Sequence, residues 1–258
     1  MKSNKALFGF IFLFALLASL GTFARDYYQI KIYTIKDKIQ ENAVDDYLKE
    51  AYIPALHRAG IKTVGVFKPI ESDQDFGAKI FVFIPLNKIE QVEKIESALL
   101  NDKKYNEAGT FYINAAFDSA PFERIESVLL RAFEKHPDYF VPNYDTPKSD
   151  QVFELRSYQS ASEKIGRKKV EMFNDGGECA LFEKLEFNPV FYGEVISGAD
   201  MPNLMYMTSF ENMESNREHW KAFVSHPDWK ELSGKEEYKN TVSHIDKWLC
   251  HPTDYSDI

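Results

Sequence analysis

A strand-like phrase that occurs twice constrains this chain more than any other feature. In residues 152–158, apolar and polar side chains alternate with a period of two, which is typical of a β-strand with two unlike faces. A similar phrase occupies residues 28–33, and the alignment of the two places Arg156 on Lys31 and Tyr158 on Tyr33. Because each phrase opens a segment with the same order of predicted elements, the chain reads as a duplicated module.

The two copies are predicted to contain the same succession of strands and helices. For the first copy the pattern predicts a strand at 28–33, a helix at 39–59, strands at 61–67 and 79–84, a helix at 89–100, a short helix or loop at 107–116 and a strand at 122–130. For the second it predicts a strand at 152–158, a helix at 162–174, strands at 189–195 and 204–210, a helix at 213–224, a short helix at 231–238 and a strand at 242–249. Gly176 and Gly177 are expected to end the helix that precedes them.

The closing strands of the two copies also correspond. Arg124-Ile125-Glu126 aligns with His244-Ile245-Asp246, and a His-Pro pair follows each strand. Each copy is therefore a β-α-β-β-α-β module of the ferredoxin-like kind, with both helices on one face of a four-stranded sheet. The face of each sheet that carries no helices would leave large side chains exposed, so it needs a second sheet to cover it. The predicted fold class is thus α+β, with two tandem modules packed sheet to sheet as a pseudo-dimeric α/β barrel.

Four segments follow from this division. Residues 1–24 have a basic start at Lys2 and Lys5, an uncharged apolar run at 6–20 and small residues up to Ala24, which is the pattern of a secretory signal peptide. A single membrane anchor is the alternative, although the run is short for a span. The remaining segments are a first module at 25–134, a linker at 135–150 and a second module at 151–258.

The charge of the chain bears on its partners. Loss of residues 1–24 removes two lysines and no acids, which changes the formal net charge from −9 to −11. We expect an exported protein, periplasmic or secreted, without stable membrane insertion after cleavage. Nucleic acid is a poor candidate partner, because phosphate binding needs clustered cations. The one basic cluster, Arg167-Lys168-Lys169, is flanked by acids and is interpreted as a solvated helix face.

The cysteines and histidines give little support for a disulfide framework or a metal site. Cys179 and Cys250 either form one bridge in an oxidising compartment or stay apart as small buried side chains. None of the six histidines forms a close pair of the metal-ligand kind, so no metal site is predicted. Neither a nucleophile motif nor a glycine-rich phosphate loop is present.

The second copy resembles the NIPSNAP family. The resemblance rests on the opening strand 153–158, on the segment 204–210 that leads into Trp220-Lys221-Ala222-Phe223, and on the turn His226-Pro227-Asp228-Trp229. The first copy looks like the same domain further diverged. The resemblance implies the dimeric α/β-barrel group, which includes cofactor-independent oxygenases, haem-degrading oxygenases, haem-dependent chlorite-decomposing enzymes and lactone isomerases. We expect no cofactor, with haem as the alternative that this group implies.

The strand alternation yields a set of candidate ligand-binding residues. If the apolar residues of each opening strand carry the helices, the residues between them face the barrel, together with charged residues of the closing strands. The candidates are Lys31, Tyr33, Arg124, Glu126, Glu154, Arg156, Tyr158, His244 and Asp246. They form either structural ion-pair networks or a pocket in which cations orient a carboxylate or enolate beside a phenol or imidazole that moves a proton.

The predicted function is binding of a small, partly apolar, anionic ligand in or beside the barrel. The first alternative is a cofactor-independent oxygenase or isomerase, or a haem-binding protein. The second is a non-catalytic module for protein association, and homo-oligomerisation is a further expectation. An interior cavity would favour ligand binding or catalysis, whereas a filled barrel would favour association.

Overall fold

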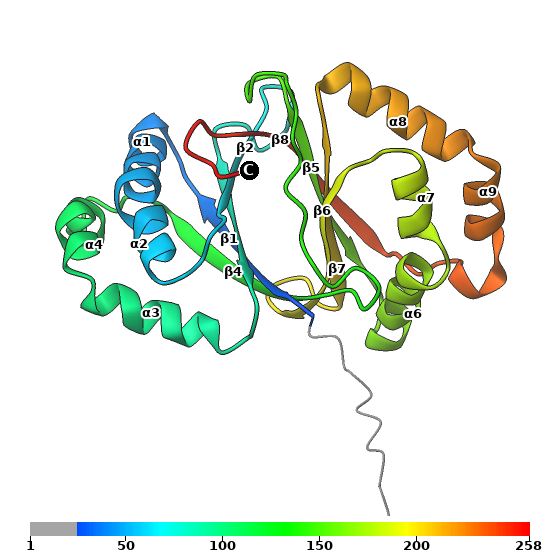
Figure 1. Ribbon diagram of the computed structural model, residues 1–258, viewed down its shortest axis with the longest axis horizontal. Helices are drawn as coiled ribbons and strands as arrows, with labels where there is room; N and C mark the ends of the chain where they lie inside the picture. The colour runs from blue at the N-terminus through cyan, green and yellow to red at the C-terminus, as the bar shows by residue number, and fades with distance from the viewer. Residues whose placement is uncertain (1–24) are drawn as a thin grey trace, which may run out of the picture.

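The computed structural model describes residues 25–258, so the predicted signal peptide lies outside the described residues. Its centre is a closed barrel of antiparallel strands in the order β1-β3-β2-β8-β5-β7-β6-β4 (Figure 1). The strands are β1 (Tyr27–Thr34), β2 (Gly65–Pro69), β3 (Lys79–Leu86), β4 (Arg124–Ala132), β5 (Val152–Gln159), β6 (Pro189–Ser197), β7 (Asn203–Phe210) and β8 (His244–Pro252).

Each module contributes four neighbouring strands, and two seams join them. The first module supplies β4-β1-β3-β2 and the second supplies β8-β5-β7-β6, with the first and last strands of each module paired as a ferredoxin-like sheet requires. At one seam β2 pairs with β8, and at the other β4 pairs with β6. The predicted pseudo-dimeric α/β barrel is therefore confirmed, and a single chain closes it.

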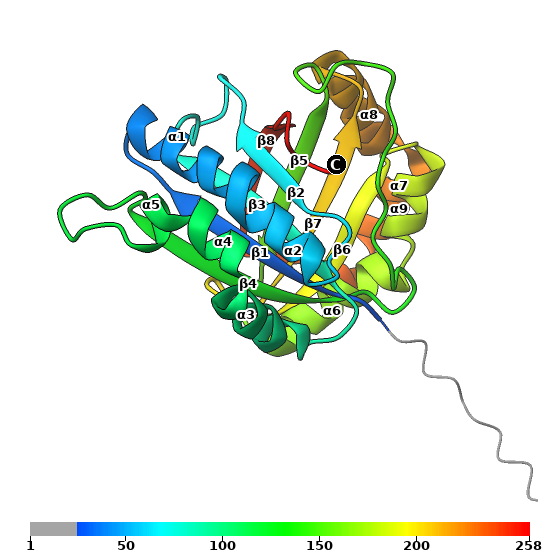
Figure 2. The same cartoon turned by 60° about the vertical axis from the view of Figure 1, so that its left-hand side comes forward.

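The helices lie outside the barrel, in one layer beside each module (Figures 1 and 2). Those of the first module are α1 (Lys38–Tyr47), the π-helical turn η1 (Leu48–Tyr52), α2 (Ile53–Arg58), α3 (Gln91–Asn101), α4 (Lys103–Ala108) and α5 (Thr110–Ile113). Those of the second are α6 (Glu163–Asn174), α7 (Glu178–Lys184), α8 (Met213–Ser225), α9 (Pro227–Gly234) and the 3-10 turn η2 (Glu236–Tyr238).

Several boundaries differ from those predicted, for local reasons. The helix predicted at 39–59 widens into a π-helical turn before Pro54, which has no backbone N–H to donate. Gly176 and Gly177 do end α6, but Gly177 then adopts a positive φ of 105° and caps a further helix, α7, which was not predicted. The strand predicted from residue 61 begins only at Gly65, where pairing with β3 starts.

The barrel interior is filled by apolar side chains from both modules. From β1, Tyr28, Ile30 and Ile32 point inward, and from β5, Phe153 and Leu155 do the same. These side chains are buried and pack with others from the remaining strands in one cluster. Fully burying a side chain of this size contributes roughly 1.5–3 kcal/mol relative to leaving it exposed, so closure of the barrel is the main source of cohesion between the modules.

The duplication extends to the pattern of burial. In both β4 and β8 the first four residues are exposed or half-buried, and every second residue from the fifth onward is buried. The registers correspond as well, because Tyr33 pairs with Ile125 just as Tyr158 pairs with Ile245. The alignment of the closing strands made from the sequence is therefore confirmed in three dimensions.

The segment after β8 returns to the first module and ties the two modules together. The N–H of Thr253 donates to the carbonyl of Val66 at 2.9 Å, and the N–H of Val64 donates to the Asp257 carboxylate at 2.7 Å. Ile258 is buried in the barrel cluster. Cys179 and Cys250 are both free and buried, in different clusters. Within residues 25–258, no helix has the length and apolarity that a bilayer span requires.

Candidate functional site

The face assignment behind the predicted site was wrong for the two opening strands. Ile30 and Ile32, like Phe153 and Leu155, face the barrel interior, so the residues between them face the helices. Lys31, Tyr33, Glu154, Arg156 and Tyr158 consequently lie between the sheet and the helix layers. Alternation alone could not reveal this, because both faces of each opening strand are buried and both need large side chains.

The candidates on the closing strands do not join these residues. Arg124 and His244 are exposed at the starts of their strands, where Arg124 donates to the backbone carbonyl of Glu123 at 2.6 Å. His244 Nε2 lies 3.2 Å from the Asp246 carboxylate. Glu126 and Asp246 are half-buried and pair across the sheet with barrel-facing residues. These four side chains therefore lie on the barrel side of the sheet, as predicted, but at the open ends of the strands and not in a closed interior.

In the first module, tyrosines fill the space beside Lys31 and Tyr33. The Lys31 ammonium lies 4.8 Å from the centre of the Tyr52 ring. Tyr47 and Tyr112 stack with their ring centres 3.6 Å apart, and burial raises the pKa of Tyr33 to about 12. These packed rings make this face a structural core.

In the second module, the corresponding candidates line a cavity of about 650 Å³ between the sheet and helices α6 to α9. Glu154, Arg156 and Tyr158 of β5 form its floor. Trp220, Phe223 and Trp229 form an aromatic wall, and the exposed side chains Val224 and Ile245 lie at its rim. The cavity joins three of the predicted residues in one place, beside the barrel and not inside it.

Glu154 is the buried centre of the floor, with 1% of its surface exposed. One carboxylate oxygen accepts from Arg156 Nε and Nη2, both at 2.7 Å. The other accepts from Asn216 Nδ2 at 2.7 Å and from Trp220 Nε1 at 2.5 Å. All these donors point at one buried anion, which fixes the orientation of Arg156 and of the helix α8 that carries Asn216 and Trp220.

Arg156 is held by contacts on several sides. Its guanidinium lies 3.8 Å from the centre of the Trp220 ring, and its Nη1 donates to the Tyr158 hydroxyl at 3.0 Å. That hydroxyl is 2.8 Å from the hydroxyl of Tyr206. Burial alone would lower the pKa of Arg156, but the oxygens of the tyrosines and of Glu154 raise it above its ordinary value. The guanidinium therefore stays charged in a half-enclosed, aromatic setting.

A second buried ion pair lies where α6 and α7 meet the cavity. Lys169 is 4% exposed and Glu178 is 1% exposed, and the ammonium lies 2.8 Å from a Glu178 oxygen. Full burial raises the pKa of Glu178, and the neighbouring Lys169 offsets part of that rise. The prediction of a solvated face for Arg167-Lys168-Lys169 is thus wrong for Lys169, because that position of the helix turns toward the sheet.

Charge around the cavity is unlike that of the whole chain. Four cationic side chains line it, namely Arg156, Lys169, Arg217 and Lys247, against two acids, Glu154 and Glu178. The two acids pair with Arg156 and Lys169. Arg217 and Lys247 are exposed at the rim and take part in none of the ion pairs found in residues 25–258. An acidic protein thus carries a cation-rich pocket.

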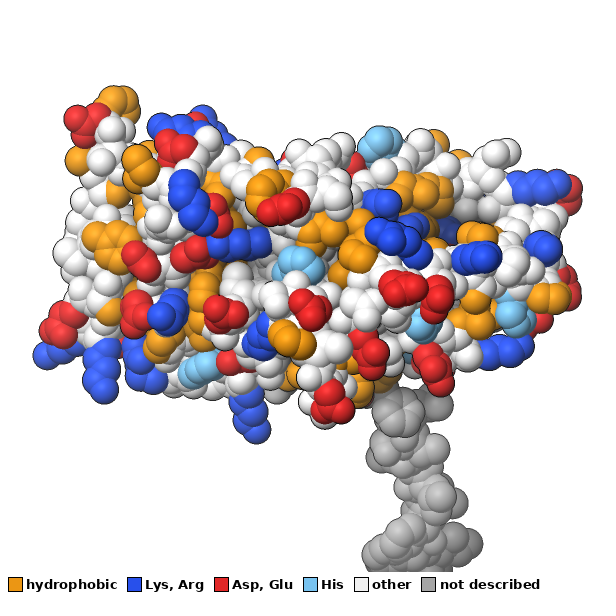
Figure 3. Space-filling view, turned by 90° about the horizontal axis from the view of Figure 1, so that it is seen from above, with side chains coloured by type: hydrophobic (Ala, Val, Ile, Leu, Met, Phe, Trp, Pro, Cys, Tyr) orange, Lys and Arg blue, Asp and Glu red, His pale blue; other side chains and the backbone are white. Residues whose placement is uncertain are grey.

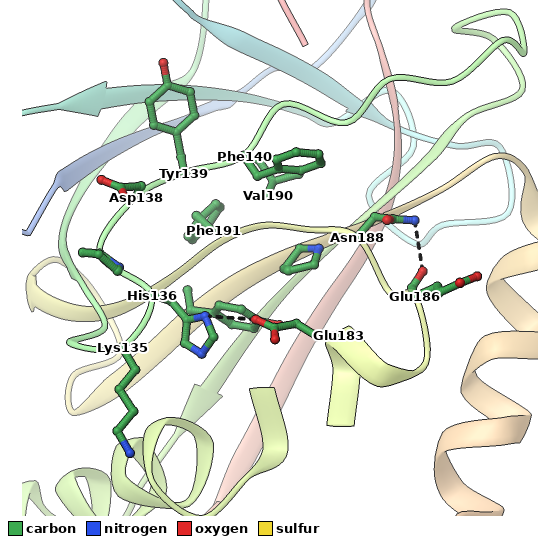
Figure 4. A pocket seen from close by; sticks show the side chains of 13 residues that line it. Lys135, His136, Asp138, Tyr139, Phe140, Glu183, Glu186, Asn188, Val190 and Phe191 are labelled. Carbon is green, nitrogen blue, oxygen red and sulfur yellow. Dashed lines mark hydrogen bonds and ion pairs between the residues drawn. The ribbon is translucent and has the colours of Figure 1, made fainter. Parts of the chain in front are cut away.

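A second depression, of about 540 Å³, lies where the linker passes β6 and the end of α7 (Figure 4). Lys135 extends away from it and binds Asp175 at 2.7 Å. His136 lies 3.4 Å from the Glu183 carboxylate, and burial lowers the pKa of this histidine. Its charged side chains are largely exposed. Exposed charges are common on this protein, and acidic and basic groups are interspersed on the face seen in Figure 3. The buried charges favour the cavity at Arg156 as the functional site.

Sequence reasoning missed most of the site, above all the residues supplied by the helices. Asn216 and Trp220 are four positions apart on α8, so both reach the same carboxylate. That spacing on one helix face was a usable signal, although nothing in the sequence tied it to Glu154. Lys169 and Glu178 sit on two helices separated by a glycine turn, and no local pattern pairs them.

The residues that line this cavity are a poor fit for haem or a metal ion. The side chains lining the cavity include no histidine, cysteine or methionine, and the hydroxyl of the lining tyrosine, Tyr158, is already bonded to Arg156 and Tyr206. His219, on the same helix, contacts Phe187 and Phe210, and its Nδ1 is 2.6 Å from the carbonyl of Ser215. No cluster of three or more metal-ligating side chains is found in the described part of the chain.

Comparison with known proteins agrees with this architecture. The family model described as NIPSNAP matches residues 153–257. A proposed monooxygenase from Lactobacillus acidophilus has a similar structure, with a TM-score of 0.56, 12% identity and coverage of 88% of this chain and 94% of its own. One from Fusobacterium nucleatum gives a TM-score of 0.56 at 10% identity, with 89% and 93% coverage. An anthrone oxidase-like protein gives 0.54 at 8% identity, with 89% and 92% coverage.

No functionally curated protein matches this sequence significantly. At 8–12% identity the structural likeness shows the fold alone. The family match covers the module that carries the cavity and its aromatic wall. Residues 153–257 therefore form a NIPSNAP domain, the second of two modules in a chain with the dimeric α/β-barrel fold.

Proposed function

We propose that this protein binds a small, flat, partly apolar anion in the cavity between the sheet and the helices of its second module. The observation that carries the proposal is Arg156, a charged guanidinium that Glu154 orients and Trp220 stacks against at the floor of the cavity. Oriented cations in desolvated surroundings are typical of sites for carboxylates and enolates.

The contacts of Arg156 leave donors for a ligand. A guanidinium has five N–H groups, and Glu154 and Tyr158 account for three of them. The rim cations Arg217 and Lys247 would attract an anion toward the opening. Phe223 and Trp229 offer apolar area to the body of the ligand.

One ligand per chain is part of the proposal. The equivalent of Arg156 in the first module is Lys31, and tyrosines pack the space around it. Buried apolar side chains from both modules crowd the barrel interior, which on its own would favour an association module. The cavity beside the barrel supplies the place that a ligand requires.

Calorimetric titration with 2-naphthoate tests the proposal. The double variant Glu154→Gln/Arg156→Met removes both charges, so neither is left buried without a partner. We expect it to bind the probe about 10- to 100-fold more weakly than the unaltered protein, because a hydrogen bond to a charged group is lost.

The matched control is Arg131→Met/Glu194→Gln, which removes the ion pair at the seam between β4 and β6. This variant should keep the affinity of the unaltered protein. Equal binding by both variants, or no binding of 2-naphthoate to the unaltered protein, would refute the proposal.

We further propose that residues 1–24 direct export and are removed before Arg25. The basic start, the apolar run and Ala24 support this. The intact mass of protein recovered from the periplasm or medium should correspond to a chain that begins at Arg25, and a chain that still begins at Met1 would contradict it.

A further inference from the structure

We infer that the ligand of this cavity carries a hydroxyl group at the end opposite its anionic group, and that Lys169 and Glu178 together select it. The inference rests on the proposed function and specifies the ligand class: a hydroxylated carboxylate or enolate with a flat apolar body. Its basis is an incompletely bonded ion pair that lines the cavity.

Lys169 has a spare donor. Of the three ammonium N–H groups, one donates to Glu178 at 2.8 Å, and a second faces the Met172 sulfur at 3.3 Å, a weak acceptor. The remaining surroundings are aromatic, with Phe173 at 4.6 Å and Trp229 at 6.0 Å between the ammonium and the ring centres. A buried ammonium with one oxygen partner can still donate to a ligand.

Glu178 has a spare acceptor. One of its oxygens accepts from Lys169, and no hydrogen bond to the other oxygen is found among the described residues. Glu178 belongs to the first turn of α7, which Gly177 positions, so its carboxylate is fixed beside the cavity by backbone geometry. The pair therefore offers one donor and one acceptor side by side.

A hydroxyl matches this pair better than a second charge does. A hydroxyl oxygen accepts from the ammonium while its hydrogen is donated to the carboxylate. Because the ammonium and the carboxylate cancel, the pair attracts no further anion, and a second carboxylate would be repelled by Glu178. Arg156 and Lys169 contact different parts of Tyr158: Arg156 donates to the hydroxyl at 3.0 Å, and the Lys169 ammonium lies over the ring, 5.4 Å from its centre. The anionic and hydroxyl ends are thus recognised separately.

Paired probes test the inference by calorimetric titration. The pairs are 2-naphthoate with 6-hydroxy-2-naphthoate, and benzoate with 4-hydroxybenzoate, which place the hydroxyl at two distances from the carboxylate. For at least one pair we expect the hydroxyl to strengthen binding about tenfold or more, since its partners are charged. Naphthalene-2,6-dicarboxylate should bind no better than 2-naphthoate.

The double variant Lys169→Met/Glu178→Gln should bind the two members of each probe pair with equal affinity, so that the advantage of the hydroxyl is lost. The matched control Lys168→Met/Glu171→Gln removes the adjacent, partly exposed pair of the same helix and should keep that advantage. Equal affinity within both probe pairs, or a gain from the second carboxylate, would overturn the inference and leave the proposed function standing. No binding of any probe would refute both.

Discussion

Replacing Glu154 by leucine is expected to lower the free energy of unfolding by about 3–5 kcal/mol, because the change leaves a largely buried charge unpaired. Arg156 would lose the acid with which it pairs, and the donors of Asn216 and Trp220 would lose their shared acceptor. Urea unfolding followed by circular dichroism measures the change. The slope of the transition should stay unaltered, since the same surface is exposed on unfolding.

The control for this result is the double variant Glu154→Leu/Arg156→Met, which removes both charges and should recover much of the lost stability. An exposed pair provides the comparison: Lys239→Met should change the free energy of unfolding by less than about 1 kcal/mol, because its partner Glu236 is solvated. A loss at Glu154 no larger than that at Lys239 would show that the network does not hold the site together.

When the two modules are produced as separate chains, neither is expected to fold as a stable monomer. Residues 25–134 or 151–258 alone would expose the barrel-facing side chains, including Tyr28 and Phe83 in the first module and Phe153 and Trp248 in the second. They would also leave the edges of β2 and β4, or of β6 and β8, without partners.

Size-exclusion chromatography with light scattering checks this expectation. Each half should either aggregate or form a dimer that closes a barrel with a second copy, and mixing the halves should restore a 1:1 complex. Two stable, monomeric halves would show that the modules are independent domains and that the shared barrel core contributes little.

Much of the fold could be predicted from local patterns. Three features were enough to predict the order of elements and the closed pair of sheets. They are the alternation in 152–158, its earlier copy and the matching closing strands. These patterns can be recognised in the sequence because successive side chains of a strand point to opposite faces whatever packs around the strand. The helix α7 was missed because Gly176 and Gly177 end one helix and Gly177 starts the next, and a glycine pair in a sequence does not show which role it has.

The site was only partly predictable, for a physical reason. Glu154, Arg156 and Tyr158 were identified because they alternate with the apolar residues of the opening strand and so share one of its faces. The sequence could not show which side of the sheet they face, since helices and barrel bury both sides. Lys169 was misassigned because a cation among charged neighbours is usually solvated. Only the packing of α6 against α7 and the sheet reveals its buried partner, Glu178.

A crystal structure of the protein with 6-bromo-2-naphthoate would test the central claim most directly, because anomalous scattering locates the bromine without prior assumptions. We predict one bromine site per chain, in the cavity of the second module, with the carboxylate at Arg156 and the ring against Trp220 or Trp229. A bromine site in the depression beside His136, in the barrel or in the first module, or none at saturating concentration, would contradict the account.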